Sequence, residues 1–362
     1  MFKDNYNKNL NPTNSRPVLY STRIERLTAL WALSESALGG VLHALRFPFR
    51  GMIISSAAIV LISMIAQFSR SRGQILKSTI LVIAAKALIS PHTPVTALFS
   101  VLIQGLLGEV FLFTRRSRFI LTLAFGITVS VLNSFQKILV LTVVFGASLW
   151  STVNDFINYI VEEWFFINTP EHTNFSFIII SIYVGIHLLI GFLAGLLAWR
   201  IPKVVTAKLS DQDNWLSITE AGIFEKKTHR GRRHKFFKPA SIIIFLMGIT
   251  IIVISYIFPV TDRFNVLDII IMISRSILIM ILWYYFISPI IRTLITKKLT
   301  GKKDGYAKEV NAVVTVLPSV KSIVYSVWKS SSKYKGFSRV YNFVIYSIVY
   351  LLADQKNQQQ SS

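Results

Sequence analysis

Long apolar runs that alternate with short basic segments constrain this chain more than any other feature of its sequence. Six runs follow one another within about 175 residues, and two more come later. The runs are 27–46, 51–68, 75–90, 95–113, 119–149, 175–201, 241–258 and 267–291. A helix needs about 20 apolar residues to cross the ~30 Å hydrocarbon core of a bilayer. The sequence therefore predicts an all-α polytopic membrane protein, with a six-helix bundle followed by two further spans.

The composition supports the prediction of a membrane protein and indicates what the basic residues contact. Of the 362 residues, 52% are hydrophobic and 15% charged, and the formal net charge is +22. In a soluble domain such a charge would suggest nucleic acid. Here the basic residues lie between apolar runs, and even the cluster 226–235 separates two of them. The predicted partner is therefore the lipid bilayer and not nucleic acid.

The distribution of Lys and Arg among the loops predicts a topology. Basic loops occupy 69–77, 114–118, 202–238 and 292–303. Between them come the loops 91–94, 150–174 and 259–266, which together hold one Arg and no Lys. Because basic loops stay in the cytoplasm, we expect both termini to be cytoplasmic, in the cytoplasmic membrane of a bacterium.

The chain divides into five predicted regions, including a polar tail without the features of a signal peptide. They are the cytoplasmic tail 1–26, the membrane domain 27–201, the basic loop 202–239, two further spans in 240–293 and amphipathic cytoplasmic helices with a polar tail in 294–362. The amphipathic helices are expected at 307–329, bent at Pro318, and at 337–353.

Two predicted helices have uncertain limits. The run 119–149 would form a helix of roughly 46 Å, longer than the hydrocarbon core. We therefore expect it to tilt, protrude or break near 134–137, where polar residues interrupt the run. The run 175–201 is expected to end before Pro202, since proline does not continue a helix well.

The first helix carries a row of small residues at four-residue spacing. Thr28, Ala32, Ser36 and Gly40 form this row, and small side chains let a neighbouring helix approach closely in lipid. The row predicts a docking face for a partner membrane subunit. The alternative is packing within the chain, against the face that carries Gly105 and Gly108.

Ionisable residues inside predicted spans are the main candidates for ligand binding, because burying them in a membrane is unfavourable. Glu35 is expected either to receive a substrate amine or to form an ion pair with Lys86. Lys86 lies about one turn from the outer end of its helix, so it is also expected to extend to the membrane surface.

Four basic residues are predicted at the outer end of the bundle. They are His43, Arg46, Arg50 and His92, and the two arginines depart from the charge bias of the other outer loops. Converging arginines and histidines can hold a carboxylate or phosphate. The alternative is contact with lipid headgroups.

Several kinds of chemistry lack their sequence signature. The chain has no cysteine, no His-Glu-x-x-His motif and no Walker A loop. No metal or cofactor is assigned, and no enzyme activity is predicted. A buried Ser/His pair stays open, because only tertiary structure could place one. Gln104 and Glu109 are expected in a structural network, and His187 as a packing partner.

Six helices, a cytoplasmic N-terminus and the small-residue row on the first helix resemble the substrate-binding components of energy-coupling factor transporters. The resemblance covers residues 27–201 and implies uptake of a small molecule. It also implies separate ATPase and transmembrane coupling subunits, with Thr28, Ala32, Ser36 and Gly40 at the docking face and 46–51 in a capping loop. The alternatives are a membrane enzyme acting on a lipid and a structural membrane protein.

Overall fold

The computed structural model describes most of the predicted membrane domain and the C-terminal helices. The described residues are 23–45, 49–69, 71–90, 93–113, 118–165, 173–210, 266–290, 293–294 and 306–353, and no strand occurs among them. The predicted run 241–258 and the basic cluster 226–235 lie outside these residues. The all-α prediction is confirmed for the part of the chain that the structure describes.

Most helices begin and end close to the predicted limits, but a further helix, Ser148–Phe165, lies where the loop 150–174 was predicted. The helices and helical turns are α1 (Arg23–Leu33), the π-helical turn η2 (Ser34–Leu38), α2 (Gly39–Ala44), α3 (Arg50–Phe68), α4 (Gln74–Ile89), α5 (Val95–Leu112), α6 (Arg118–Phe145), α7 (Ser148–Phe165), α8 (Phe175–Ser210), α10 (Val266–Leu282), the π-helical turn η4 (Trp283–Ile287), α12 (Tyr306–Ser330), the 3₁₀ turn η5 (Ser331–Lys333) and α13 (Gly336–Leu352). Pro94 directly precedes α5, and Gly73, at φ 80°, directly precedes α4.

Of the three alternatives predicted for the fifth run, the break near 134–137 does not occur. α6 continues without interruption to Phe145 and ends at Gly146, whose φ of 85° suits glycine. Polar residues near the predicted break are bonded to α5 instead. Ser100 Oγ donates to Asn133 Oδ1 at 2.9 Å, and Gln136 Nε2 donates to the carbonyl of Thr96 at 2.6 Å. Because a neighbouring helix satisfies these side chains, the backbone has no need to unwind.

The predicted end of the sixth run at Pro202 is also wrong. α8 continues through the buried Pro202 to Ser210, so the first residues of the predicted basic loop are helical. Thr206 Oγ1 donates to the Pro202 carbonyl at 2.9 Å, one turn beyond the proline. Packing of α8 against α3, α6 and α13 outweighs the backbone hydrogen bond that proline cannot make.

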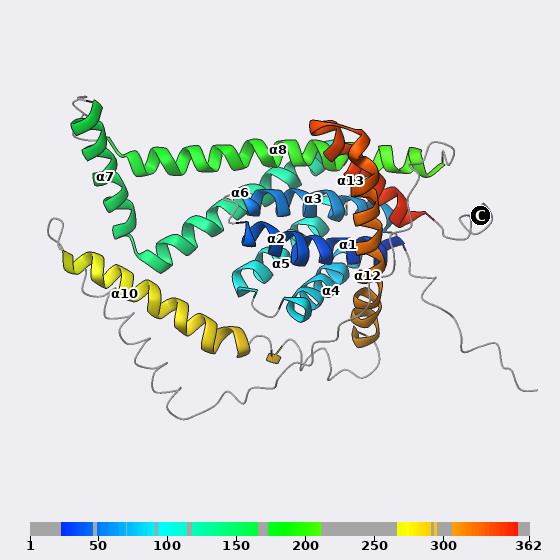
Figure 1. Ribbon diagram of the computed structural model, residues 1–362, viewed down its shortest axis with the longest axis horizontal. Coiled ribbons are helices and arrows are strands. Elements are labelled where there is room, and N and C mark those ends of the chain that lie inside the picture. The colour runs from blue at the N-terminus through cyan, green and yellow to red at the C-terminus, as the bar shows by residue number, and fades with distance from the viewer. Residues whose placement is uncertain are drawn as a thin grey trace, which may run out of the picture.

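The membrane helices enclose one apolar core. Figure 1 shows α1, α3 and α8 running side by side along the long axis, with α6 inclined to them. Trp31, Ile59, Ile62, Val82 and Phe125 are fully buried, and they come from α1, α3, α4 and α6. In lipid such close packing replaces the hydrophobic effect as the main attraction between helices.

The C-terminal helices close one end of this bundle. α12 lies across the long axis in Figure 1, and valines of α12 and isoleucines of α13 belong to the same core. Polar contacts add to the packing. Lys77 pairs with Glu309 at 2.7 Å, and Arg26 Nη1 donates to the carbonyl of Leu351 at 3.1 Å. Lys208 Nζ donates to Tyr346 Oη at 3.1 Å. The end with the predicted cytoplasmic loops is therefore the end that carries α12 and α13.

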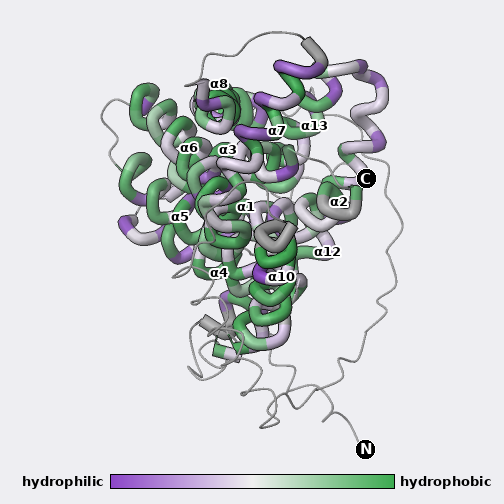
Figure 2. Tube along the Cα trace, turned by 90° about the vertical axis from the view of Figure 1, so that its left-hand side faces the viewer, coloured by the Kyte–Doolittle hydropathy of each residue, from purple (hydrophilic) through white to green (hydrophobic). Residues whose placement is uncertain are grey.

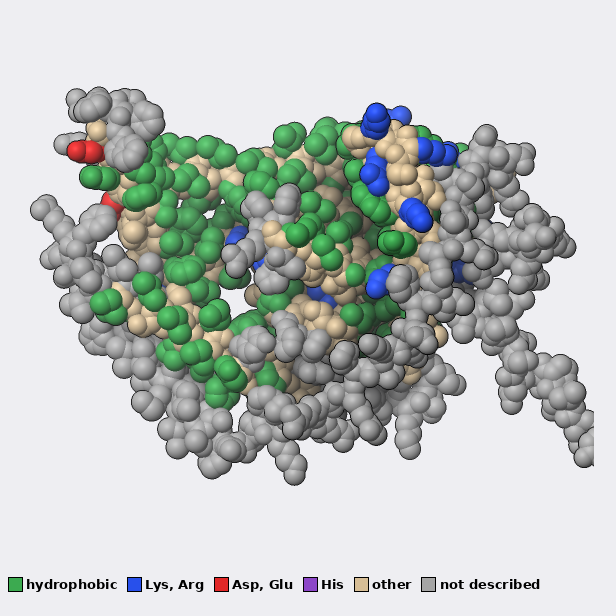
Figure 3. Space-filling model, in the orientation of Figure 1, with side chains coloured by type: hydrophobic (Ala, Val, Ile, Leu, Met, Phe, Trp, Pro, Cys, Tyr) green, Lys and Arg blue, Asp and Glu red, His purple; other side chains and the backbone are tan. Residues whose placement is uncertain are grey.

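The two ends of the bundle differ in charge. α7 lies crosswise at the opposite end and exposes Asp155, Glu162 and Glu163. Figure 3 shows acidic side chains there, whereas Lys and Arg gather over the C-terminal helices. The basic C-terminal helices and the acidic helix α7 thus lie at opposite ends of the bundle, and which end faces the cytoplasm stays a prediction.

The described residues contain six helical stretches that are long and apolar enough to cross a membrane. By length and composition they are α3, α5, α6, α8, Ile273–Ile290 and Glu309–Lys333. Hydrophobic stretches run along these helices in Figure 2. Outward-facing Val110, Leu139 and Phe177 are between 62% and 71% exposed, as in helices that face lipid. The chain thus has the features of a multi-pass helical membrane protein.

The lengths of the helices do not decide whether the chain has the eight predicted spans. The predicted spans 27–46 and 75–90 form helices but fall short of the length required of a continuous α-helix. The stretch Glu309–Lys333, predicted outside the bilayer, is long enough but lies mostly in α12, across the bundle axis. The number of spans therefore stays a prediction.

Candidate functional site

A buried ion pair joins the first helix to α4. Lys86 Nζ lies 2.7 Å from Glu35 Oε2, and the two side chains are 7% and 3% exposed. The ion-pair alternative predicted for Glu35 is therefore present. The prediction that Lys86 extends to the membrane surface is wrong, because its ammonium group turns inward to the carboxylate. Breaking a pair this well buried would leave a charge without compensation.

Glu35 lies in the π-helical turn η2, which separates α1 from α2. In a π-turn one extra residue enters the helix, so the residues that follow are rotated by about 100° from their α-helical positions. η2 contacts α3 and α4 as well as its own helix. Single π-turns inside α-helices occur often at functional sites.

Three polar atoms in this turn and in the last turn of α1 are buried and have no hydrogen-bond partner among the described residues. They are Trp31 Nε1, Glu35 Oε1 and Ser36 Oγ. Buried polar atoms in proteins are nearly always bonded. η2 and the last turn of α1 therefore carry one indole donor, one carboxylate acceptor and one hydroxyl group in addition to the ion pair. These atoms can form hydrogen bonds with both donor and acceptor groups.

The structure places the other predicted ligand residues only in part. Arg50 is exposed at the first residue of α3. Arg46, His92 and the side chain of His43 lie outside the described residues, so the convergence of four basic residues stays a prediction. Lys86 is three residues from the end of α4.

The small-residue row is divided by the π-turn. Thr28 and Ala32 are buried, and Thr28 Oγ1 lies 2.9 Å from Ser78 Oγ of α4. Ser36 is half-buried, whereas Gly40 is exposed with open space around it. The docking prediction is therefore wrong for Thr28 and Ala32, because a partner subunit cannot reach them.

The predicted internal partner of the row is also wrong. Thr28 contacts Ser78 of α4, whereas the side chains nearest to Gly105 and Gly108 come from α3, α4 and α6 and not from the first helix. A side chain at Gly105 would collide with Thr79, and one at Gly108 would collide with Ile62. Both glycines thus serve contacts of α5 with α4 and α3.

Glu109 has a structural role, as predicted, although the sequence did not reveal its partners. Its carboxylate accepts hydrogen bonds from the backbone N–H groups of Gly73, Ile75 and Leu76, at 2.6 to 3.2 Å. It thereby satisfies free donors at the beginning of α4 and places a negative charge at the positive end of the helix dipole. The sequence feature that could have indicated this role is an acidic residue near the end of α5, at the level where α4 begins.

A Ser/His pair exists between α6 and α8, but its geometry favours packing. Ser130 Oγ lies 3.3 Å from His187 Nδ1, and the hydroxyl donates to the His187 carbonyl at 2.7 Å. A nucleophilic serine needs its proton directed to the imidazole. Both residues are at most 3% exposed, so the pair joins two helices, as predicted for His187.

Comparisons with known proteins add no relative. No protein-family model, no curated protein and no solved structure matches this chain. The resemblance to energy-coupling factor components therefore rests on the sequence pattern alone.

Proposed function

We propose that this chain is a membrane subunit that binds a small molecule beside the Glu35–Lys86 pair for uptake. One observation carries the proposal: Glu35 lies in a π-helical turn, pairs with Lys86 and keeps one buried carboxylate oxygen without a partner among the described residues. Ionisable side chains among membrane helices are rare and commonly mark a ligand or ion path.

A purely structural role explains these features less well. A buried ion pair often gives no more stability than well-packed apolar residues of similar volume. A structural pair would also be expected to have all its polar atoms bonded. The free atoms of Trp31, Glu35 and Ser36 instead match a polar ligand. A donor group on the ligand would bind Glu35 Oε1, and an acceptor group would bind the Trp31 indole N–H.

Uptake in this proposal depends on other subunits. The chain has no Walker A loop, so ATP would be hydrolysed by separate ATPase subunits, as in the energy-coupling factor transporters that it resembles. Gly40 is the exposed member of the small-residue row and is the proposed contact for a transmembrane coupling subunit. His43, Arg46, Arg50 and His92 would add contacts to an anionic group of the ligand.

The topology in this proposal can be tested by cysteine labelling, since the natural chain has no cysteine. A membrane-impermeant maleimide should label Asp155→Cys on α7 in intact cells. It should label Arg72→Cys, at the end with α12, only after permeabilisation. The reversed labelling pattern would contradict a cytoplasmic position of the basic loops.

Ligand binding can be tested with a variant that removes both charges of the pair. Glu35→Leu combined with Lys86→Met leaves no unpaired charge, so the protein should stay folded. Small molecules released on denaturation are then identified by mass spectrometry, for the natural chain and the variant. We expect the natural chain to release a small molecule that the variant lacks.

Ser130→Ala serves as the control for this experiment. It removes a buried hydrogen bond between α6 and α8 and should leave the released ligand unchanged. A folded double variant that retains the same ligand would assign the ion pair a structural role and reject the proposed site.

A further inference from the structure

A cavity lies between four helices at the end of the bundle that carries α12 and α13. It has a volume of about 190 Å³ and is lined by residues of α3, α5, α6 and α8. Small-molecule sites usually measure about 300–1,000 Å³. This cavity is therefore too small for most whole substrates and has the size of a headgroup.

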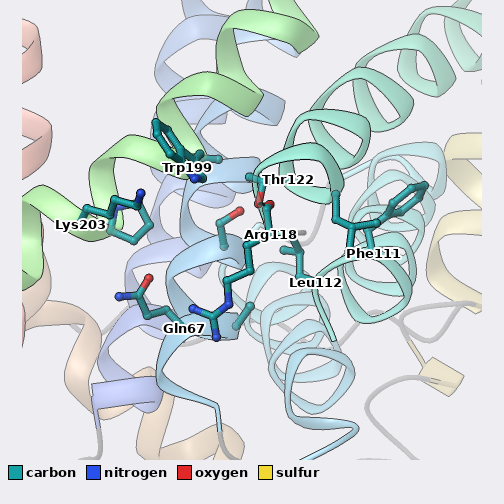
Figure 4. A pocket seen from close by; sticks show the side chains of 12 residues that line it. Gln67, Phe111, Leu112, Arg118, Thr122, Trp199 and Lys203 are labelled. Carbon is teal, nitrogen blue, oxygen red and sulfur yellow. Dashed lines mark hydrogen bonds between the residues drawn. The ribbon is translucent and has the colours of Figure 1, made fainter. Parts of the chain in front are cut away.

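The rim of the cavity is basic. Arg118 begins α6 and Lys203 lies on α8, and both side chains are exposed. The acidic partners in the ion pairs Lys77–Glu309 and Lys86–Glu35 belong to other basic residues, and no acidic side chain of the described part of the chain lines the cavity. Figure 4 shows Lys203 and Trp199 on one side of the cavity, Arg118 in the middle and Gln67 below it. The rim thus presents two positive charges and an amide.

An aromatic side chain and an apolar base complete the cavity. Lys203 Nζ lies 3.7 Å from the centroid of the Trp199 ring, which in turn packs edge-on against Phe119 at 4.9 Å. Ala198 and Pro202 are buried at the cavity wall. Tryptophan beside a basic residue is typical of the level at which lipid headgroups meet the apolar core. The combination fits a molecule with an anionic head and an apolar tail.

We propose that this cavity binds the phosphate of an anionic phospholipid. Arg118 and Lys203 bind the phosphate oxygens, Gln67 donates a further hydrogen bond, and the apolar wall contacts the start of the acyl chains. Basic pockets between membrane helices on the cytoplasmic side bind anionic headgroups in other membrane proteins. The site is independent of the Glu35–Lys86 pair and does not require the proposed uptake function.

Native mass spectrometry of the full chain in detergent tests this proposal. Phosphatidylglycerol should bind with defined stoichiometry, and zwitterionic phosphatidylcholine should bind much more weakly. Arg118→Gln with Lys203→Gln should weaken phosphatidylglycerol binding at least about tenfold, because each basic side chain makes a charged hydrogen bond. Arg200→Gln, an exposed arginine on the same helix that does not line the cavity, should leave binding unchanged.

Several outcomes would overturn the proposal. Equal binding of phosphatidylglycerol and phosphatidylcholine by the natural chain would by itself contradict the proposal. An equal loss in Arg200→Gln would indicate attraction to the basic surface as a whole. If inorganic phosphate alone binds saturably and excludes phosphatidylglycerol, the ligand is a free phosphate and not a lipid. Should the double variant not fold, each single variant is measured, and unchanged binding in both would reject the site.

Discussion

Replacing Lys86 with Met is expected to destabilise the protein by about 3–5 kcal/mol, the largest effect that we predict for any single substitution. The change leaves the Glu35 carboxylate buried at 3% exposure without the ammonium group that lies 2.7 Å away. The free energy of unfolding of the Lys86→Met variant should be measured in detergent, by titration with a denaturing detergent or by thermal melting. Glu35→Leu should show a loss of similar size, because it leaves Lys86 as the uncompensated charge.

The double variant Glu35→Leu/Lys86→Met is the decisive comparison. Two apolar side chains of similar length can pack where the ion pair lies, so most of the stability should return. The coupling energy of the pair is the stability lost in the double variant minus the sum of the stabilities lost in the two single variants. A loss below about 1 kcal/mol in both single variants would match a water-exposed pair and contradict the buried geometry.

The second large effect is expected at Gly126, where α6 and α8 make the most extensive helix contact of the described elements. A Cβ atom at Gly126 would lie 2.6 Å from the Gly191 carbonyl oxygen and 2.8 Å from the Gly195 Cα atom. Both are backbone atoms, so the helices must separate to admit a methyl group. Gly126→Ala should therefore lower the free energy of unfolding by about 1–3 kcal/mol, and Gly126→Leu by more.

Gly185→Ala is a matched control for this prediction. Gly185 lies on α8, the helix that Gly126 of α6 faces, and no atom outside its own helix lies within 4 Å of the added Cβ position. Its replacement should leave stability unchanged or slightly improve it, since alanine favours the helix over glycine. A thermal melt in detergent compares the two variants. Equal melting temperatures for Gly126→Ala and Gly185→Ala would contradict close contact between α6 and α8.

The α6–α8 contact explains how one polar cluster is held in an apolar bundle. Gly126, Gly191 and Gly195 bring the two backbones together, and Ser130 bonds the His187 carbonyl beside them. Short side chains and a bonded hydroxyl are the usual means by which membrane helices associate.

Much of the fold follows from local properties of the sequence. Apolar runs and their basic borders predicted the helices α3 to α6 and α8 to within a few residues at most of their ends. The reason is physical: in lipid, every backbone polar group must be bonded within the segment, so an apolar run has little alternative to a helix. The candidate pair of Glu35 and Lys86 was also accessible to sequence reasoning, since charges in such runs are rare.

Only the tertiary structure decided the remaining features. Lys86 is 51 residues from Glu35, and their pairing depends on how α4 packs beside the π-turn. The course of α8 through Pro202 and the role of Glu109 likewise depend on neighbouring helices. The basic cavity draws its lining from four helices. The sequence by itself determined that the long apolar runs are helical, because backbone hydrogen bonding is local. Tertiary packing determined which side chains meet, because those contacts join residues far apart in the chain.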